Sequence, residues 1–349
     1  MTGKSTLFRL LTGAAAQPHA ARGEAQVGVS KVPDPRLDRL ADMYKPRKVV
    51  PATIEYLDLA GVEKGSAAKV LPLDQLRVTD ALAHVVRAFR DEAVHHGEGS
   101  IDPARDAATM ETELILADHA IAERRIKKLE LQVKKVNRDE DKEELQLIRK
   151  SLAQLEQEIP LRKVEFTERE RYRLRGFTFL SLKPLLIVVN ADEDDAAHLH
   201  EGPARFGLES FATRPNTGVV VLSGKIEEEI SQLDPDDAAA FRSELGIQQP
   251  ALERMIRGSY DLLGKISFFT VGEDECRAWT IDRATPARRA AGAIHSDIEK
   301  GFIRAEVVAY EDLIEAGAWS AARERGTLRL EGKEYPIKDG DISHFRFNV

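Results

Sequence analysis

The stretch Gly3-Lys4-Ser5-Thr6-Leu7-Phe8 decides the fold, because it has the pattern of a phosphate-binding loop that runs directly into a helix. Glycine lets backbone N–H groups curl around phosphate oxygens, and the N-terminus of a helix adds a favourable positive potential. Lys4 would reach the outer phosphates, and the hydroxyl of Ser5 would bind a magnesium ion. The complete pattern has a further glycine and a strand upstream. The short motif is therefore weak evidence by itself, and the rest of the chain has to support it.

The composition indicates a globular protein of a reducing compartment. A chain of 349 residues is expected to form two or three domains. A single cysteine excludes a disulfide framework and argues against a structural zinc site. No apolar stretch reaches the length of a membrane span. The net charge of −8 argues against DNA or other nucleic acid binding over the whole surface, but it leaves room for a local basic face. We therefore expect a cytoplasmic protein without a membrane partner.

A predicted strand over residues 54–59 ends in Asp58-Leu59-Ala60-Gly61. In P-loop proteins, a carboxylate at a strand end followed by a glycine is the usual sensor of magnesium and of the γ-phosphate. This pattern makes Asp58 the second metal ligand beside Ser5, and it makes Gly61 a catalytic residue together with Lys4. An ordinary strand-to-loop turn explains the same residues equally well. Strands alternate with helical segments here, which predicts a mostly parallel sheet with ligands at the strand C-terminal ends.

Two later strands, over residues 184–190 and 218–222, lead into loops that resemble base-binding loops. The first loop is Asn190-Ala191-Asp192-Glu193, where guanine-nucleotide proteins carry Asn-Lys-x-Asp. Glu193 replaces the aspartate that accepts the guanine N–H groups, so we expect guanine to bind weakly and adenine to be preferred. The second loop is Ser223-Gly224-Lys225. The predicted nucleotide-binding residues are Gly3, Lys4, Ser5, Thr6, Asn190, Glu193, Ser223 and Gly224.

Residues 111–158 have a different character, because apolar residues recur at steps of three and four on both sides of a polar break at 137–139. Two heptad-patterned helices around a short turn form an antiparallel coiled-coil hairpin. Charges of both signs fill the other positions, as on a solvated helical face. Two interpretations stay open: a simple projecting arm, or an arm that reaches a large partner.

The C-terminal part, from residue 266, changes pattern again. Strands are predicted over residues 266–271 and 277–281, followed by a helix over 286–294, a strand over 302–308, a helix after Tyr310 and closing strands. One short helix on a small curled sheet is a β-grasp layout. Arginines in this part, such as Arg304, could contact RNA phosphates, although a solvated surface of mixed charge explains them at least as well.

Together these motifs resemble the YchF, or Obg-like, branch of ATPases among the P-loop proteins related to translation factors. The resemblance covers nearly the whole chain. It implies an α/β fold: a P-loop, G-domain-like, mostly parallel sheet over residues 1–110 and 165–264, a coiled-coil insertion over 111–164, and a ubiquitin-like TGS domain over 265–349. It also implies ATP preferred over GTP, Mg²⁺ as cofactor, and association with the ribosome and its RNA. The motifs that carry it are Val32-Pro33-Asp34-Pro35-Arg36-Leu37-Asp38, Asp58-Leu59-Ala60-Gly61, Glu113-Leu114-Ile115-Leu116-Ala117-Asp118, Asn190-Ala191-Asp192-Glu193, Phe268-Phe269-Thr270-Val271-Gly272-Glu273-Asp274-Glu275-Cys276-Arg277-Ala278-Trp279, Gly301-Phe302-Ile303-Arg304-Ala305-Glu306 and His344-Phe345-Arg346-Phe347-Asn348-Val349.

The sequence also departs from the family pattern. The family has Gly-Leu-Pro-Asn-Val and a strand ahead of the position of Gly3, so we expect a divergent member that is short at its N-terminus. The first switch is replaced by residues 18–23, and the second is eroded to residues 66–71. Val62 follows Gly61 where many GTPases hold a glutamine that orients water, and an apolar side chain cannot do so.

Two functions from different classes follow. The first is a slow Mg²⁺-dependent ATPase, expected to be a monomer, that acts as a nucleotide-dependent switch on the ribosome. The second is a hydrolysis-deficient adaptor on a ribosome or RNA, with a degenerate P-loop. Calorimetric binding of ATP and GTP, phosphate release and the variant Lys4→Ala separate them.

Overall fold

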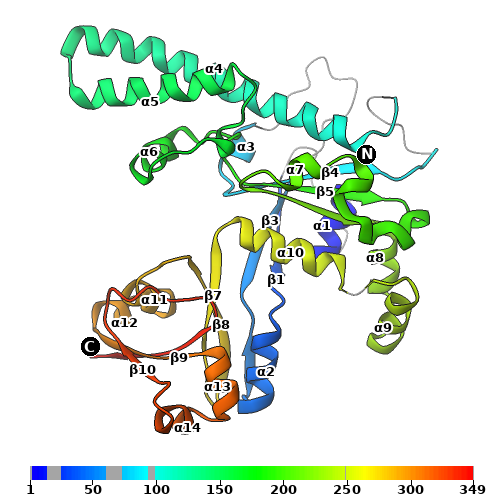
Figure 1. Ribbon diagram of the computed structural model, residues 1–349, viewed down its shortest axis with the longest axis vertical. Coiled ribbons are helices and arrows are strands. Elements are labelled where there is room, and N and C mark those ends of the chain that lie inside the picture. Colours follow the sequence, from blue (N-terminus) through cyan, green and yellow to red (C-terminus); the bar gives the residue numbers. More distant parts are fainter. Residues whose placement is uncertain (1, 14–24, 60–72, 93–98, 248, 349) are drawn as a thin grey trace. The chain divides into compact units, whose positions relative to one another are not determined.

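The computed structural model describes the chain except for residues 1, 14–24, 60–72, 93–98, 248 and 349. The chain forms two compact units, and each unit is built from two segments (Figure 1). Unit 1 contains Met1–Gly28 and Tyr56–Leu262, and unit 2 contains Val29–Glu55 and Leu263–Val349. No helix among the described residues is long and apolar enough to cross a membrane.

The sheet of unit 1 is parallel and has the strand order β4-β5-β6. Every residue of the central strand β5 is buried, as expected for a strand covered on both faces. In the register of the sheet, Val86 lies beside Val189, which lies beside Val221. The predicted mostly parallel sheet is therefore confirmed. The strands are β4 (Leu82–Ala88), β5 (Leu185–Ala191) and β6 (Thr217–Leu222).

Helix α1 (Lys4–Thr12) belongs to unit 1 and begins directly after Gly3. Its buried side chains, Leu7, Phe8 and Leu11, lie on one face, and the helix packs against α8 and α10. The strands β1 (Gln26–Lys31) and β3 (Thr53–Asp58) form a separate two-stranded sheet. The remaining helical segments of unit 1 outside the hairpin region are α3 (Leu73–Arg77), η3 (Glu193–Phe206), α7 (Glu209–Ala212), α8 (Gly224–Ser231), α9 (Pro235–Glu244) and α10 (Ala251–Leu262).

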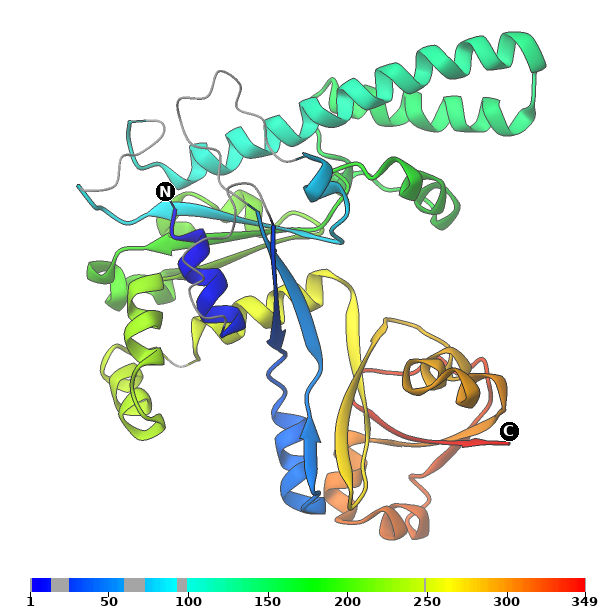
Figure 2. The same ribbon diagram turned by 180° about the vertical axis from the view of Figure 1, so that it is seen from behind.

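The predicted hairpin is confirmed as α4 (Pro103–Val136) and α5 (Asp139–Leu155), which Figure 2 shows side by side. Helix α4 begins where the Asp102 carboxylate accepts the N–H of Arg105 at 3.0 Å, with Pro103 at the first helical position. It ends at Asn137, whose φ of 54° stops the helix at the polar break. The segments η1 (Leu161–Lys163), α6 (Glu168–Leu174) and η2 (Arg175–Phe177) follow α5. The buried core of this region consists of Ile115, Ala122, Ile126, Leu129, Leu145, Leu147, Ile148, Leu155, Leu161, Phe166, Leu174 and Phe179.

Two buried carboxylates of α4 fix the hairpin to the rest of unit 1. Glu111 accepts hydrogen bonds from Arg162 at 2.9 Å and from Arg214 at 2.7 Å. About two turns further along the same helix, Asp118 accepts the backbone N–H groups of Leu180 at 2.9 Å and Ser181 at 2.6 Å. The partners of Asp118 lie in the segment that leads into β5, whereas Arg162 lies in η1 and Arg214 lies just before β6. Buried polar bonds therefore hold α4 to the segments that lead into the sheet.

Unit 2 is a mixed sheet with the strand order β10-β9-β11-β7-β8-β2. Strand β2 (Lys48–Val50) pairs in parallel with β8, so residues 29–55 join the C-terminal part and not the expected 1–110 segment. Arg36 of α2 (Pro35–Tyr44) fixes this join, because it bonds to Asp34 and Asp339 and lies over the Phe269 ring. The other strands are β7 (Lys265–Thr270), β8 (Glu275–Asp282), β9 (Phe302–Ala309), β10 (Arg329–Glu331) and β11 (Asp341–Phe347), and the helices are α11 (Ala287–Ile294), α12 (Ser296–Lys300), α13 (Tyr310–Ala316) and α14 (Trp319–Glu324).

Candidate phosphate-binding site

The start of α1 and the end of β3 bring Lys4, Ser5 and Asp58 together, as the sequence predicts. The ammonium group of Lys4 donates to Oδ1 of Asp58 and to the backbone carbonyl of Leu59. The hydroxyl of Ser5 donates to the other carboxylate oxygen, Oδ2, at 3.0 Å. Both oxygens of Asp58 are therefore bonded to side chains of α1. The Asp58 side chain is 10 % exposed and that of Lys4 is 35 % exposed, so a ligand can reach the lysine.

The backbone at the start of α1 suits an anion. Gly3 has a φ of 82°, in the left-handed region that favours glycine, and this conformation turns the chain into the helix. The first turn contains no acidic side chain. The positive end of the helix dipole and the free N–H groups of the first turn are therefore not neutralised by a carboxylate of the helix itself. Such a helix end binds phosphate.

The donor set at this site fits a magnesium ion. The Ser5 hydroxyl and the Asp58 carboxylate are hard oxygen donors that lie 3.0 Å apart, and Mg²⁺ prefers such ligands. In the described part of the chain, no group of three or more His, Cys, Asp or Glu residues could hold a metal. A metal bound here would thus take its remaining ligands from phosphate and water, as is usual for Mg²⁺.

Asn190 joins the phosphate side of the site to the second base-binding loop. Its Nδ2 donates to the backbone carbonyl of Thr2 at 3.0 Å, and its Oδ1 accepts the N–H of Gly224 at 2.8 Å. The residue is the last but one of β5 and is 6 % exposed. A Cβ on Gly3 would lie 2.3 Å from Nδ2, and one on Gly224 would lie 3.2 Å from Oδ1, so both glycines make room for this amide. The sequence predicts that Asn190 frames the base, and in the structure its amide bonds two backbone groups.

The remaining base-side residues have distinct roles. Glu193 forms an exposed ion pair with Lys225 at 2.5 Å, and this hydrogen bond raises the pKa of Lys225. Asp192 accepts the backbone N–H of Arg90 at 2.8 Å, which lowers the pKa of its carboxyl and fixes the loop to the end of β4. The sequence gives no signal for that contact, because the backbone of Arg90 makes it. Ser223 is buried and caps α8.

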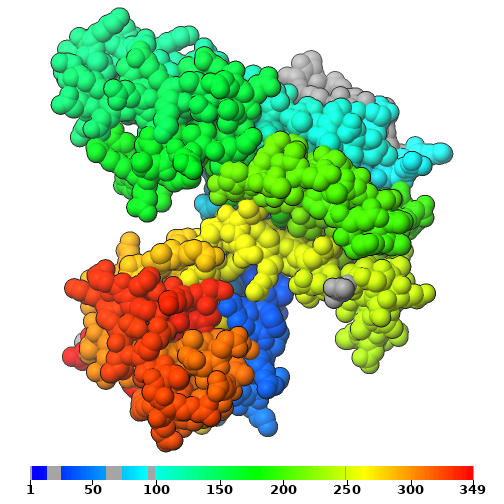
Figure 3. Space-filling view, in the orientation of Figure 1, coloured from blue at the N-terminus to red at the C-terminus, as the bar shows by residue number. Residues whose placement is uncertain are grey.

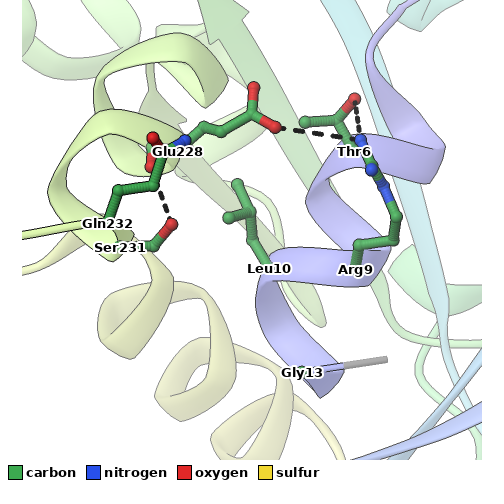
Figure 4. Close-up of a pocket in the computed structure, with 7 residues that line it drawn as sticks. All are labelled: Thr6, Arg9, Leu10, Gly13, Glu228, Ser231 and Gln232. Carbon is green, nitrogen blue, oxygen red and sulfur yellow. Dashed lines mark hydrogen bonds and ion pairs between the residues drawn. The ribbon is translucent and has the colours of Figure 1, made fainter. Parts of the chain in front are cut away.

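Thr6 faces a different part of the molecule. Its hydroxyl accepts a hydrogen bond from Arg9 at 3.5 Å, and both side chains line a cavity of about 230 Å³ between α1 and α8 (Figure 4). Glu228 of α8 lies 3.9 Å from Arg9 across this cavity. The structure places the Thr6 side chain on the α8 side of the helix. Gly61 and both altered switch segments, 18–23 and 66–71, lie outside the described residues.

Comparisons with known proteins give a consistent result. Residues 265–348 match a family model named YchF-GTPase_C and described as "Protein of unknown function (DUF933)". The chain is 42 % identical over 358 residues to the "Ribosome-binding ATPase YchF" of Bacillus subtilis, an alignment that covers 99 % of this chain and 96 % of that protein. It is 40 % identical over 354 residues to the protein of the same name from Escherichia coli O157:H7, with the same coverage. The solved structure of the Schizosaccharomyces pombe YchF GTPase superposes with a TM-score of 0.86 at 32 % identity, covering 99 % of this chain and 95 % of that one.

Proposed function

This chain belongs to the YchF family, and from that premise we propose that it is a ribosome-associated P-loop protein that binds ATP in preference to GTP and hydrolyses it slowly. The observation that carries the proposal is the contact of Lys4 and Ser5 with Asp58 at the N-terminus of α1. Lysine, hydroxyl and carboxylate are the groups that P-loop proteins use on a nucleoside triphosphate and its metal.

The geometry supports an exchange of partners at Lys4. The ammonium group of Lys4 forms an ion pair with the Asp58 carboxylate. A triphosphate at the start of α1 would draw Lys4 to its outer phosphates, where the lysine stabilises the charge that builds up during phosphoryl transfer. Asp58 and Ser5 would then be free to hold Mg²⁺, which supplies charge neutralisation between the phosphates when it is bound. Gly61 would donate its N–H to the γ-phosphate.

The base side supports adenine. Glu193 stands where guanine-binding proteins have an aspartate, and its carboxylate is engaged by Lys225 at 2.5 Å. Guanine would have to compete with this ion pair for the carboxylate, whereas adenine has no pair of N–H groups that needs it. Asn190 and Gly224 hold the surrounding backbone, and Ser223 holds the start of α8.

We base the slow rate on the sequence, in which Val62 stands where many GTPases hold a glutamine that orients water. In the described part of the chain, the side-chain partners of Asp58 are Lys4 and Ser5. Hydrolysis would then depend on the backbone or on a partner. A slow turnover suits a switch, in which the bound nucleotide sets the state of an assembly.

The relatives named above are ribosome-binding ATPases, which supports a ribosome with its RNA as the partner of this chain and the cytoplasm as its location. We propose that the protein acts as a monomer without a DNA partner. We also propose that the strands of residues 265–349 form a TGS-type β-grasp domain, which would provide a second surface for the partner besides the hairpin.

The test measures phosphate release and co-sedimentation with ribosomes in the presence of Mg²⁺, with ATP, with ADP and without nucleotide. We expect slow release of phosphate from ATP and a ribosome affinity that differs between the nucleotide states. Asp58→Asn should lose both effects, and Asp236→Asn, the same change at an exposed position of α9, should retain them. Equal pelleting in all states without phosphate release would overturn the ATPase proposal and support the adaptor.

A further inference from the structure

Helix α6 presents an exposed aromatic side chain between arginines. Tyr172 is 71 % exposed, compared with 44 % for Phe347, another exposed aromatic residue of the chain. It lies in the sequence Arg169-Glu170-Arg171-Tyr172-Arg173-Leu174-Arg175. A tyrosine that leaves most of its ring in water is unusual without a partner, because its apolar ring gains free energy on burial.

The exposure of Tyr172 does not result from a frayed helix. Thr167 and Glu170 form a complete capping box at the start of α6. Leu174 is fully buried in the core of the hairpin region, and Lys150 of α5 bonds to Glu170 at 2.9 Å. Figure 3 shows this region as one continuous green surface with the hairpin. The helix is therefore anchored on one face and holds Tyr172 out on the other.

Arginines outnumber carboxylates on the exposed side of α6, where the exposed Glu168 lies one turn before Tyr172. Arg169 and Arg173 share a single carboxylate, that of Glu143, at 2.8 and 2.6 Å. Arg175 follows Tyr172 by three positions and lies on its side of the helix, and Arg171, also exposed, lies one turn before Arg175; neither arginine has a carboxylate partner among the described residues. The guanidinium carbon of Arg175 lies 5.6 Å from the centroid of the Tyr172 ring. One face of the ring is thus backed by a cation while the rest of it remains accessible.

We propose that Tyr172, Arg171 and Arg175 bind an unpaired segment of RNA, with one base stacked on the tyrosine ring and the arginines on the flanking phosphates. This inference rests on the proposed function, since it names the part of the chain that would contact ribosomal RNA. An exposed aromatic ring beside arginines is the arrangement with which proteins bind single-stranded RNA. A duplex buries its base faces and would leave the ring unused. The acidic chain as a whole, with a net charge of −8, would confine RNA to such local faces.

The test is the binding of a fluorescein-labelled single-stranded A12 RNA to the full-length protein, followed by anisotropy at several salt concentrations. Tyr172→Ala should weaken binding about ten-fold, and Tyr172→Phe, which keeps the ring, should bind within about two-fold of the wild type. A plot of the logarithm of the binding constant against the logarithm of the salt concentration has a negative slope. Arg171→Ala and Arg175→Ala should each reduce the magnitude of this slope by about 0.7. Arg283→Ala, the same change at an exposed position of unit 2, is the control and should bind as the wild type does.

The outcomes separate this inference from the proposed function. Thermal unfolding midpoints equal to that of the wild type establish that the variants are folded, as expected for exposed side chains. If wild type pellets with ribosomes but Tyr172→Ala binds A12 as tightly as wild type, the inference is overturned and the proposed function stands. The inference is also overturned if the A12·U12 duplex binds more tightly than single-stranded A12. Displacement of A12 by poly-glutamate, together with no effect of Tyr172→Ala on A12 binding, overturns it as well. If the wild type fails to pellet but the A12 series behaves as expected, the proposed function fails and this RNA site remains.

Discussion

The side chain of Asn190 uses both ends of its amide to hold two loops in place. One end binds the Thr2 carbonyl before α1, and the other binds the N–H of Gly224 at the start of α8. Because the residue is 6 % exposed, either bond left unmade would leave a buried polar group without a partner. The bonds therefore keep the backbone of Gly3 at a fixed place relative to β5.

A methyl group at Gly3 should disrupt this arrangement. In Gly3→Ala the new Cβ would lie 2.3 Å from Nδ2 of Asn190, in addition to the strain of a φ of 82°. Gly13→Ala is a matched control, because Gly13 has a φ of 63° and no described atom within 4 Å of its added Cβ. We expect Gly3→Ala to cost about 1–3 kcal/mol more unfolding free energy than Gly13→Ala, measured by urea denaturation. Equal costs would show that the Asn190 contact is absent.

The site residues differ in how well the sequence predicts them. Lys4, Ser5 and Asp58 follow from local motifs, since a phosphate-binding loop and a strand-end carboxylate each have a recognisable pattern. The sequence does not predict the partners of Asn190 or the Glu193–Lys225 ion pair. These contacts join segments that only the folded sheet brings together.

At the scale of elements, long periodic patterns predict best. The hairpin was predictable because its apolar repeat runs over many turns and its break coincides with Asn137, which ends α4. Strand β5 was predictable as a continuous apolar run. The short strand β2 was not, because its three residues carry little pattern and it pairs with β8, far along the chain.

The anchoring of α4 by buried charge gives a second prediction. Glu111→Ala would leave the fully buried guanidinium of Arg162 without its carboxylate, and such a loss costs about 3–5 kcal/mol. Glu130 of the same helix also pairs with an arginine, Arg149, at 2.7 Å, but both side chains are exposed. Glu130→Ala should therefore cost less than about 1 kcal/mol in the same denaturation experiment. Similar losses for the two variants would mean that the Glu111 cluster does not anchor the hairpin.

The sheet of unit 2 gives a prediction about pH. Two hydrogen bonds from Arg346, at 3.1 and 3.2 Å, hold the pKa of Glu306 below its usual value of 4.5. The unfolded chain therefore binds more protons than the folded one in this range, and the stabilisation is complete above pH 4.5 and is lost as the pH falls through the lowered pKa.

Glu306→Gln removes the titrating group, so its unfolding free energy should fall less than that of wild type between about pH 5 and about pH 3. Glu324→Gln, the same change at an exposed position of α14, should follow the wild-type pH curve. Urea denaturation at each pH measures the difference. Parallel curves for wild type and Glu306→Gln would show that the carboxylate is not stabilised by Arg346.

At the scale of the whole molecule, each compact unit is assembled from two separate segments of the chain. The fold class follows from the order of strands and helices. The assignment of residues 29–55 to unit 2 does not, because it depends on contacts such as that of Arg36 with Asp339, 303 positions apart. Lys4, Ser5 and Asp58, the proposed phosphate and metal site, lie in unit 1, which also carries the hairpin and α6. A change at the nucleotide and a partner on the hairpin would thus act on one compact body.

The most direct test of this account is a calorimetric titration of Mg²⁺-ATP and Mg²⁺-GTP into the wild type, Lys4→Ala and Lys127→Ala, an exposed lysine of α4. The account predicts that the wild type binds ATP more tightly than GTP. It predicts that Lys4→Ala weakens ATP binding on the order of 10- to 100-fold, and that Lys127→Ala binds as the wild type does. Equal ATP affinity for the wild type and Lys4→Ala would contradict a phosphate site at the start of α1.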